Sequence, residues 1–242
     1  MLICFALLYS LGIFYPIKFL NKKDFITYYY ILLLIPCGFL FSFNNVRQAA
    51  AIGLFYFFYF SSSIKISYLS SIFAHLSNIA LILSEYISNI KYKFIRNYFI
   101  PLAWIPFSYS LQYILHIIWK YEFSDRNIYG KYSIFYISIF GIIYLYLLSS
   151  KVSKNDFYLK KITTTSAFLF ASSLFIIPVS NSYSLRILTS FFPLVLLGII
   201  NLTSEMKSRS LIRLAILSFS FLVCFLYYIR MSPERTFEIF KV

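Results

Sequence analysis

Apolar stretches of bilayer length follow one another along this chain and leave no long polar segment between them. Of the 242 residues, 60% are hydrophobic and 12% are charged, and the mean hydropathy is +0.77, far outside the range of a soluble domain. We therefore expect one all-α integral-membrane domain, residues 1–242, built as a polytopic bundle of about 8–9 transmembrane or re-entrant helices of about twenty residues each. The apolar runs cover residues 2–20, 25–43, 49–63, 68–87, 98–119, 134–150, 162–178, 185–203 and 211–230.

Charge is distributed unevenly along the sequence. The formal net charge is +14, and the basic residues lie mainly in short connections between apolar runs. Basic connections of this kind set membrane topology and contact anionic lipid headgroups. The expected partners are therefore membrane lipids, and nucleic-acid binding is not expected.

The basic connections favour one of two topologies. The lysine-rich connection 18–23 is expected in the cytoplasm, which places 44–48 outside. If the run 68–87 crossed the membrane, the later basic connections would fall outside, against the positive-inside rule. We prefer a re-entrant or buried 68–87 segment, which returns those connections to the cytoplasm. On this topology 44–48, 120–131 and 181–186 face outward, and 91–96, 151–161 and 207–213 face inward.

Two arginines stand at the head of apolar runs. Arg47 follows Asn44 and Asn45 and precedes Gln48, and Arg186 opens a late run. A guanidinium keeps its charge and is costly at membrane depth unless it meets water, a partner or an anionic ligand. The pair suggests a site for a negatively charged ligand. The alternatives are a snorkelling interfacial role for Arg47 and an ordinary basic helix end for Arg186.

The fourth run, 68–87, carries the polar residues His75, Ser77, Asn78 and Glu85. Because a histidine titrates near neutral pH, His75 is a candidate general base, with a hydrogen-bonded packing role as the alternative. The second histidine, His116, has the setting of an interfacial residue.

Three segments resemble motifs of the EpsG-like, Wzy-type polysaccharide polymerases. Residues 43–52, FNNVRQAAAI, look like that family's N-x-x-R-Q-x-x-A helix start. Residues 72–81, IFAHLSNIAL, are similar to its F-H-x-S-A-L segment, although Ala74 separates the Phe from the His. Residues 184–188, SLRIL, resemble the arginine that opens a late helix. The order and spacing agree across 32–201.

The resemblance implies a polymerase at the outer face of the bacterial inner membrane. Such enzymes transfer a glycan from undecaprenyl pyrophosphate to a sugar hydroxyl of an incoming lipid-linked unit, alongside a chain-length regulator. By this resemblance Arg47 and Arg186 stabilise the departing pyrophosphate, and His75 assists the acceptor hydroxyl. The remaining candidates, which contact substrate, are Asn44, Asn45, Gln48 and Ser77. No cofactor is implied.

Other interpretations stay open. A transporter or flippase of lipid-linked sugars would also use buried arginines, but proton coupling normally needs intramembrane carboxylates, and the eight acidic residues lie almost all in connections or the tail. A metal-dependent glycosyltransferase would need an outer carboxylate pair, for which Glu122 and Asp125 are the candidates. No metal site is expected from Cys4, Cys37 and Cys224, which lie at unrelated spacings.

The chain is also shorter than the polymerases that it resembles. Members of that family usually carry additional helices and an acidic residue in an early outer loop. We therefore expect the N-terminal helices of the family to be missing here. A short relative, a misassigned start and an inactive truncated membrane bundle are the three possibilities.

Overall fold

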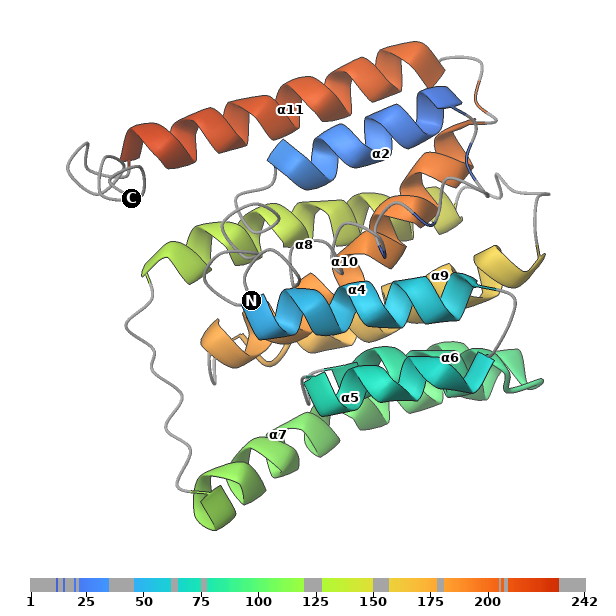
Figure 1. Cartoon of the computed structure of the whole chain (residues 1–242), viewed down its shortest axis with the longest axis vertical. Helices are drawn as coiled ribbons and strands as arrows, with labels where there is room; N and C mark the ends of the chain where they lie inside the picture. Colours follow the sequence, from blue (N-terminus) through green and yellow to red (C-terminus); the bar gives the residue numbers. More distant parts are fainter. Residues whose placement is uncertain are drawn as a thin grey trace.

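The computed structural model describes residues 12, 15, 20, 22–34, 46–61, 65–74, 78–119, 128–149, 157–177, 181–204, 206 and 209–230. These residues are helical throughout apart from short turns, with no strand among them, which confirms the all-α class. The elements are α2 (Lys22–Leu34), α4 (Val46–Phe60), η2 (Lys65–Ser70), α5 (Ser71–Ala74), α6 (Ile79–Ser88), η4 (Ile95–Phe99), α7 (Ile100–Trp119), α8 (Ile128–Ser149), α9 (Phe157–Leu174), α10 (Asn181–Ser204) and α11 (Arg209–Arg230) (Figure 1).

Most helices begin a few residues before the apolar run that predicted them. α4 starts at Val46 where the run starts at 49, and α8 starts at Ile128 where the run starts at 134. Polar residues can occupy the first turn of a helix, so hydropathy alone places the boundary too late. The first predicted run, 2–20, lies outside the described residues except for Gly12, Tyr15 and Leu20.

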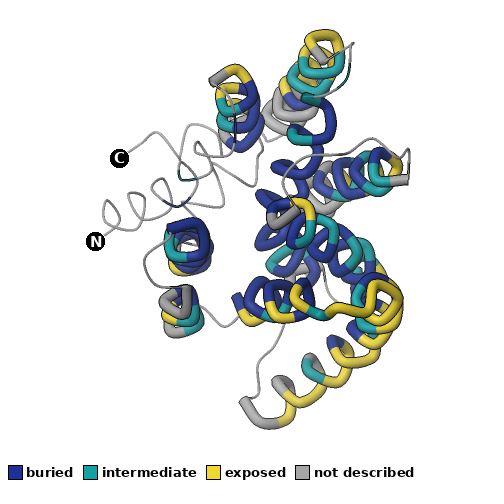
Figure 2. The backbone as a smooth tube through the Cα atoms, turned by 90° about the vertical axis from the view of Figure 1, so that its right-hand side faces the viewer, coloured by how far each residue is buried: buried dark blue, intermediate teal, exposed yellow. Residues whose placement is uncertain are grey.

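α10 forms the centre of the bundle. It packs against α8, α9, α2, α6 and α11, and every residue from Ile187 to Ile200 is buried. Figure 2 shows this buried centre surrounded by helices with exposed outer faces. Phe140 of α8 meets Phe192 of α10 edge to face, with ring centroids 5.4 Å apart. A mostly apolar helix that is surrounded by others supplies the core to which the outer helices attach.

Two separate helical stretches, 65–74 and 79–88, which we call the two arms, lie within 65–88 in place of one long helix. η2 and α5 run back along α4, and α6 then returns in the opposite direction (Figure 1). The first arm, η2 with α5, has six plus four residues, and the second arm, α6, has ten. Each is therefore about 15–20 Å long. Each arm is therefore too short to cross a hydrocarbon core of about 30 Å.

Chain direction sorts the helix ends into two groups. The starts of α2, α9 and α11 lie at one end of the bundle with the link from α6 to α7; we call this the basic end (Figure 1). The starts of α4, α8 and α10 lie at the other, the Arg47 end. Connections expected on opposite membrane faces thus lie at opposite ends of the bundle.

One helix among the described residues is long and apolar enough to cross a membrane by length and composition. It covers Ser184–Ser204, with a mean hydropathy of 1.9, and 83% of that stretch is buried. Three further apolar helices are shorter, at Ile79–Ser88, Ile137–Leu148 and Ser210–Leu222. The described residues therefore establish a helical bundle. The number of helices that cross a membrane stays a prediction from the sequence.

Gly198 permits close contact between α8 and α10. A Cβ at this position would lie 2.2 Å from Cζ of Tyr144, whose side chain is buried. An interior ring has little room to move, because protein cores are packed as densely as organic crystals.

We predict that Gly198→Val lowers stability by about 1–3 kcal/mol, because the added side chain must displace Tyr144. Thermal unfolding of the purified protein in detergent measures the change. Ala215→Val, on the exposed side of α11, is the control and should unfold close to the wild-type temperature. Equal unfolding temperatures for both variants would contradict the tight α8–α10 contact.

Candidate functional site

A glutamine side chain joins the starts of α4 and α10. Gln48 is buried, and its Nε2 donates to the carbonyl oxygen of Arg186 at 2.8 Å and to Oγ of Ser190 at 3.3 Å. About two turns further along α4, the Tyr56 hydroxyl donates to the carbonyl of Ser190, one turn after Arg186 in α10, at 3.3 Å. These bonds connect residues more than 130 positions apart in sequence and fix the two helix starts side by side.

The two predicted arginines lie within the first two turns of two neighbouring helices, α4 and α10. Arg47 occupies the second position of α4, and its side chain is exposed. Arg186 lies in the second turn of α10 and is half-buried. Neither helix has an acidic residue in its first turn. The contact made by Gln48 joins the helices that carry Arg47 and Arg186, and the roles of these residues in a site stay predictions.

The local electrostatics favour an anion at this end. A helix N-terminus presents unpaired N–H groups and a partial positive charge. A cation in the first turn, such as Arg47, adds to that positive potential instead of offsetting it. Helix starts of this kind bind phosphate and carboxylate groups, and an arginine fork adds bidentate donors.

Two buried oxygen atoms near these helix starts have no hydrogen-bond partner among the described residues. They are Oε1 of Gln48 and Oγ of Ser184. Ser184 is fully buried in the first turn of α10. A buried hydroxyl without a partner is available to a ligand or a water molecule.

Several predicted site residues cannot be placed. Asn44, Asn45, His75 and Ser77 lie outside the described residues, as does the His116 side chain. Their proposed roles stay predictions from the sequence.

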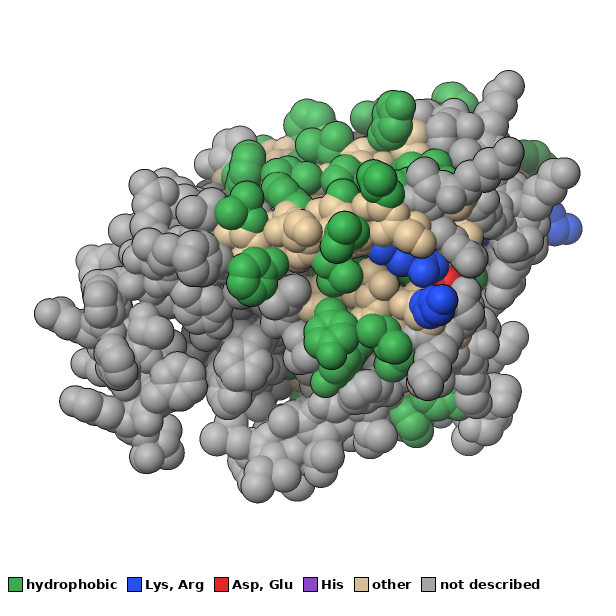
Figure 3. Space-filling model, turned by 90° about the horizontal axis from the view of Figure 1, so that it is seen from above, with side chains coloured by type: hydrophobic (Ala, Val, Ile, Leu, Met, Phe, Trp, Pro, Cys, Tyr) green, Lys and Arg blue, Asp and Glu red, His purple; other side chains and the backbone are tan. Residues whose placement is uncertain are grey.

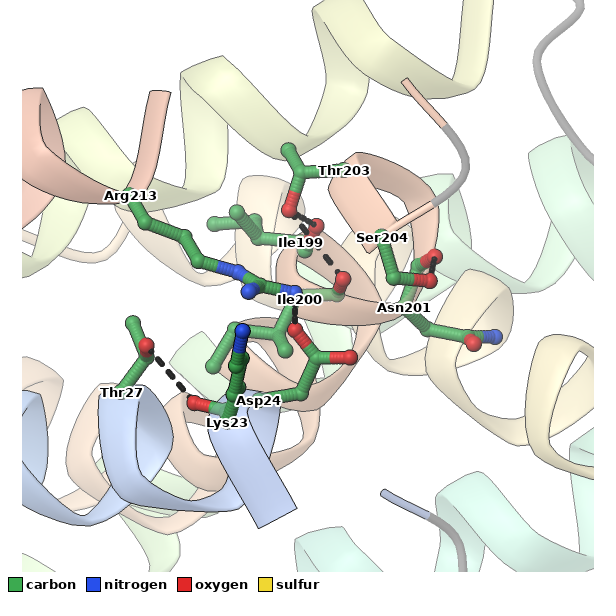
Figure 4. A network of polar contacts seen from close by, with 9 residues as sticks. All are labelled: Lys23, Asp24, Thr27, Ile199, Ile200, Asn201, Thr203, Ser204 and Arg213. Atoms are coloured by element: carbon green, nitrogen blue, oxygen red, sulfur yellow. Dashed lines mark hydrogen bonds and ion pairs between the residues drawn. The ribbon is translucent and has the colours of Figure 1, made fainter. Parts of the chain in front are cut away.

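The basic end holds charged groups that pair within the protein. Asp24, in the first turn of α2, forms an ion pair with Arg213 of α11 (Figure 4). The side chains are 2% and 11% exposed, so the pair is largely removed from water. Because breaking a buried pair leaves an uncompensated charge, this contact ties α2 to α11. Sequence reasoning missed it, since it treated Asp24 as part of a connection.

Glu85 is the second buried carboxylate. It lies in α6 and accepts from Asn89 Nδ2 at 3.2 Å and from Ser88 Oγ at 3.5 Å. Lys161 Nζ donates to Asn89 Oδ1 at 3.3 Å, which links the end of α6 to α9. Asp24 and Glu85 are the two acidic residues that the structure describes, and both are buried within helices.

Asn78, which was not among the predicted site residues, is also fully buried. Neither its Nδ2 nor its Oδ1 has a hydrogen-bond partner in the described part of the chain. The sequence shows Asn78 as one of several polar residues in the apolar run 68–87. Its lack of hydrogen-bond partners depends on the packing around it.

The described residues contain no group of three or more His, Cys, Asp or Glu side chains that could hold a metal ion. The carboxylate pair Glu122 and Asp125 lies outside them. Comparisons with protein-family models, curated proteins and solved structures find no match to this chain. Any functional assignment therefore rests on the chemistry of its own residues.

We predict that Gln48→Glu lowers stability by about 1–3 kcal/mol, because the carboxylate has no donor for the Arg186 carbonyl and its oxygens face that carbonyl oxygen instead. Gln48→Met should cost less than about 1.5 kcal/mol, since the Arg186 carbonyl keeps the Ser190 hydroxyl as a donor. Thermal unfolding measures both. A milder effect from Glu than from Met would mean that the α4–α10 bond is absent.

Proposed function

We propose that this chain is a multi-span protein of the bacterial inner membrane that polymerises undecaprenyl-pyrophosphate-linked oligosaccharide repeat units at the outer face. The observation that carries the proposal is the hydrogen bond from Gln48 to the Arg186 carbonyl. It joins the two arginine-bearing helix starts that the resemblance to Wzy-type polymerases selects as the site of the leaving group.

The distribution of polar and apolar side chains supports a membrane location. Large hydrophobic side chains lie on the outer faces of α7, α8 and α11, including Leu102 at 66%, Tyr146 at 72% and Leu211 at 71% exposed. Figure 3 looks down on α2 and α11 and shows hydrophobic side chains across that face, with basic side chains gathered at one end. Soluble monomers rarely expose apolar patches of this extent.

The hydrogen bonds of buried serine and threonine hydroxyls also support a membrane location. Serine and threonine inside the bundle donate to carbonyls of their own helix one turn earlier, as Thr163 does to Leu159 at 2.7 Å and Ser173 to Leu169 at 2.8 Å. Such bonds satisfy polar groups without water, which a helix within lipid requires.

The proposed reaction is a glycosyl transfer. The acceptor sugar hydroxyl attacks the anomeric carbon of the growing glycan, the bond from that carbon to the pyrophosphate oxygen breaks, and undecaprenyl pyrophosphate leaves. Arg47 and Arg186 stabilise the negative charge that develops on the leaving oxygen. His75 accepts the hydroxyl proton. Asn44, Asn45, Gln48 and Ser77 position the substrates.

Transport of a lipid-linked sugar is the second candidate, and one observation favours it. Asp24 and Glu85 are buried carboxylates within helices, whereas the sequence suggested that acidic residues lie mostly in connections. Buried carboxylates occur in proton-coupled transporters. Asp24, however, is held in an ion pair by Arg213, so Glu85 is the more informative residue for a test.

The multi-span arrangement predicts the accessibility of single cysteines. In cells that express a variant lacking Cys4, Cys37 and Cys224, Asn181→Cys should react with an impermeant thiol reagent. Lys93→Cys, at the basic end, should react only after permeabilisation. Labelling of both positions in intact cells would contradict a single orientation across the membrane.

Arginine geometry predicts the outcome of charge-conserving substitutions. Arg47→Lys keeps the charge but loses the planar fork, so polymer synthesis should fall roughly 10²-fold, and Arg47→Ala should be at least as impaired. Arg186→Lys tests whether both arginines hold the leaving group. Arg96→Lys, at the basic end, is the matched control and should leave polymer length unchanged. Full-length glycan from Arg47→Lys, at normal protein levels, would return Arg47 to an interfacial role.

Glu85→Gln separates polymerisation from proton-coupled transport. The amide keeps an acceptor for Asn89 but cannot carry a proton between states. A polymerase should retain near wild-type polymer length, measured on gels beside membrane levels of the protein. Loss of proton-dependent translocation of lipid-linked sugars in vesicles would instead favour the transporter.

A further inference from the structure

Asn78 is placed like a helix cap but does not act as one. It directly precedes α6 at the N-cap position, with φ −71° and ψ −11°, and its side chain makes no capping hydrogen bond. An asparagine at this position ordinarily accepts from a backbone N–H of the first turn. The usual structural reason for an asparagine here is therefore absent.

The other end of the same helix offers a contrast. Asn89 follows α6, and its amide donates to the Glu85 carboxylate and accepts from Lys161. Asn78 is fully buried, and both polar atoms of its amide lack a hydrogen-bond partner in the part of the chain that the structure describes. Buried amides left unpaired at both atoms lower stability, so natural proteins contain few of them. This residue is better explained by a ligand than by folding.

Asn78 opens a helix that packs against the centre of the bundle. This helix, α6, contacts α9 and α10. α10 carries Arg186. The N-terminal turn of α6 also supplies backbone N–H groups next to the side-chain amide.

The chemistry of an amide selects a neutral polar ligand. Nδ2 donates and Oδ1 accepts, so a phosphate would satisfy the first atom and be repelled by the second. Two neighbouring sugar hydroxyls satisfy both, because one oxygen can accept from Nδ2 while the other hydroxyl donates to Oδ1.

We propose that Asn78 binds a pair of neighbouring hydroxyls on a sugar of the lipid-linked repeat unit. This inference rests on the proposed function, and it assigns to the polymerase a sugar-binding residue separate from the arginines that hold pyrophosphate. Asn78 acts in binding and takes no part in proton transfer.

The test compares Asn78→Leu with Asn89→Leu in the full chain, reconstituted in lipid nanodiscs. The probe is lipid-linked repeat units extracted from the producing cells. Without probe, Asn78→Leu should melt at or above the wild-type temperature, because leucine replaces an unpaired amide with an apolar group of similar size. With probe, it should lose the upward shift that the wild type shows, and the KM for repeat units should rise roughly 10- to 100-fold.

The control should behave in the opposite way. Asn89→Leu removes a donor to Glu85, so it should melt lower than the wild type and keep the shift with probe. A lower melting temperature of Asn78→Leu without probe would show a structural role and overturn the proposal. A retained shift in Asn78→Leu, or no shift in the wild type, would also overturn it.

The two proposals can fail separately. A wild-type protein that is stabilised by repeat units but forms no polymer would refute polymerisation. If Asn78→Leu abolished that stabilisation, the sugar-binding role of Asn78 would stand.

Discussion

Burial of α10 on every side governs how the rest of the bundle is held. Its interior Thr189, Ser190 and Thr203 hydroxyls donate to carbonyls of their own helix, as Ser190 does to Arg186 at 2.9 Å and Thr203 to Ile199 at 2.9 Å, whereas Ser184 Oγ has no partner among the described residues. Hydrogen bonds from a second helix reach α10 near its start, where Gln48 and Tyr56 of α4 donate to two of its carbonyls. Because these bonds are directional while apolar packing is not, they set the position of α4 along α10.

The two ends of the bundle use polar groups differently. At the basic end, the charge of Asp24 is balanced by Arg213, and Glu85 accepts a hydrogen bond from Asn89, so each buried carboxylate has a partner within the protein. At the Arg47 end, the first two turns of α4 and α10 carry Arg47 and Arg186, neither helix has an acid in its first turn, and Gln48 Oε1 lacks a partner among the described residues. Balanced charge supports the fold. Positive potential beside an unpaired atom is the pattern of a ligand site.

The sequence predicts structural features that have a local cause and misses those that depend on tertiary contacts. The length of the apolar runs located most helices, and the motif order selected Arg47, Gln48 and Arg186, of which Gln48 bonds the backbone of Arg186 in the structure. The Asp24–Arg213 pair could not be found this way, since it depends on α2 packing against α11. Asn78 was visible only as one polar residue in an apolar run; that its amide lacks partners is a property of its tertiary surroundings.

The membrane setting of the proposed function adds a constraint on Asn78. The described stretches 65–74 and 79–88 have ten residues each, about half the number that crosses a hydrocarbon core, and polar groups at membrane depth persist only if protein or water covers them. The Asn78 amide, buried and unpaired, needs a polar partner for the same reason. On the proposed function the two recognition tasks fall to different groups: the arginines of α4 and α10 hold the charged leaving group, and the neutral Asn78 amide selects sugar hydroxyls.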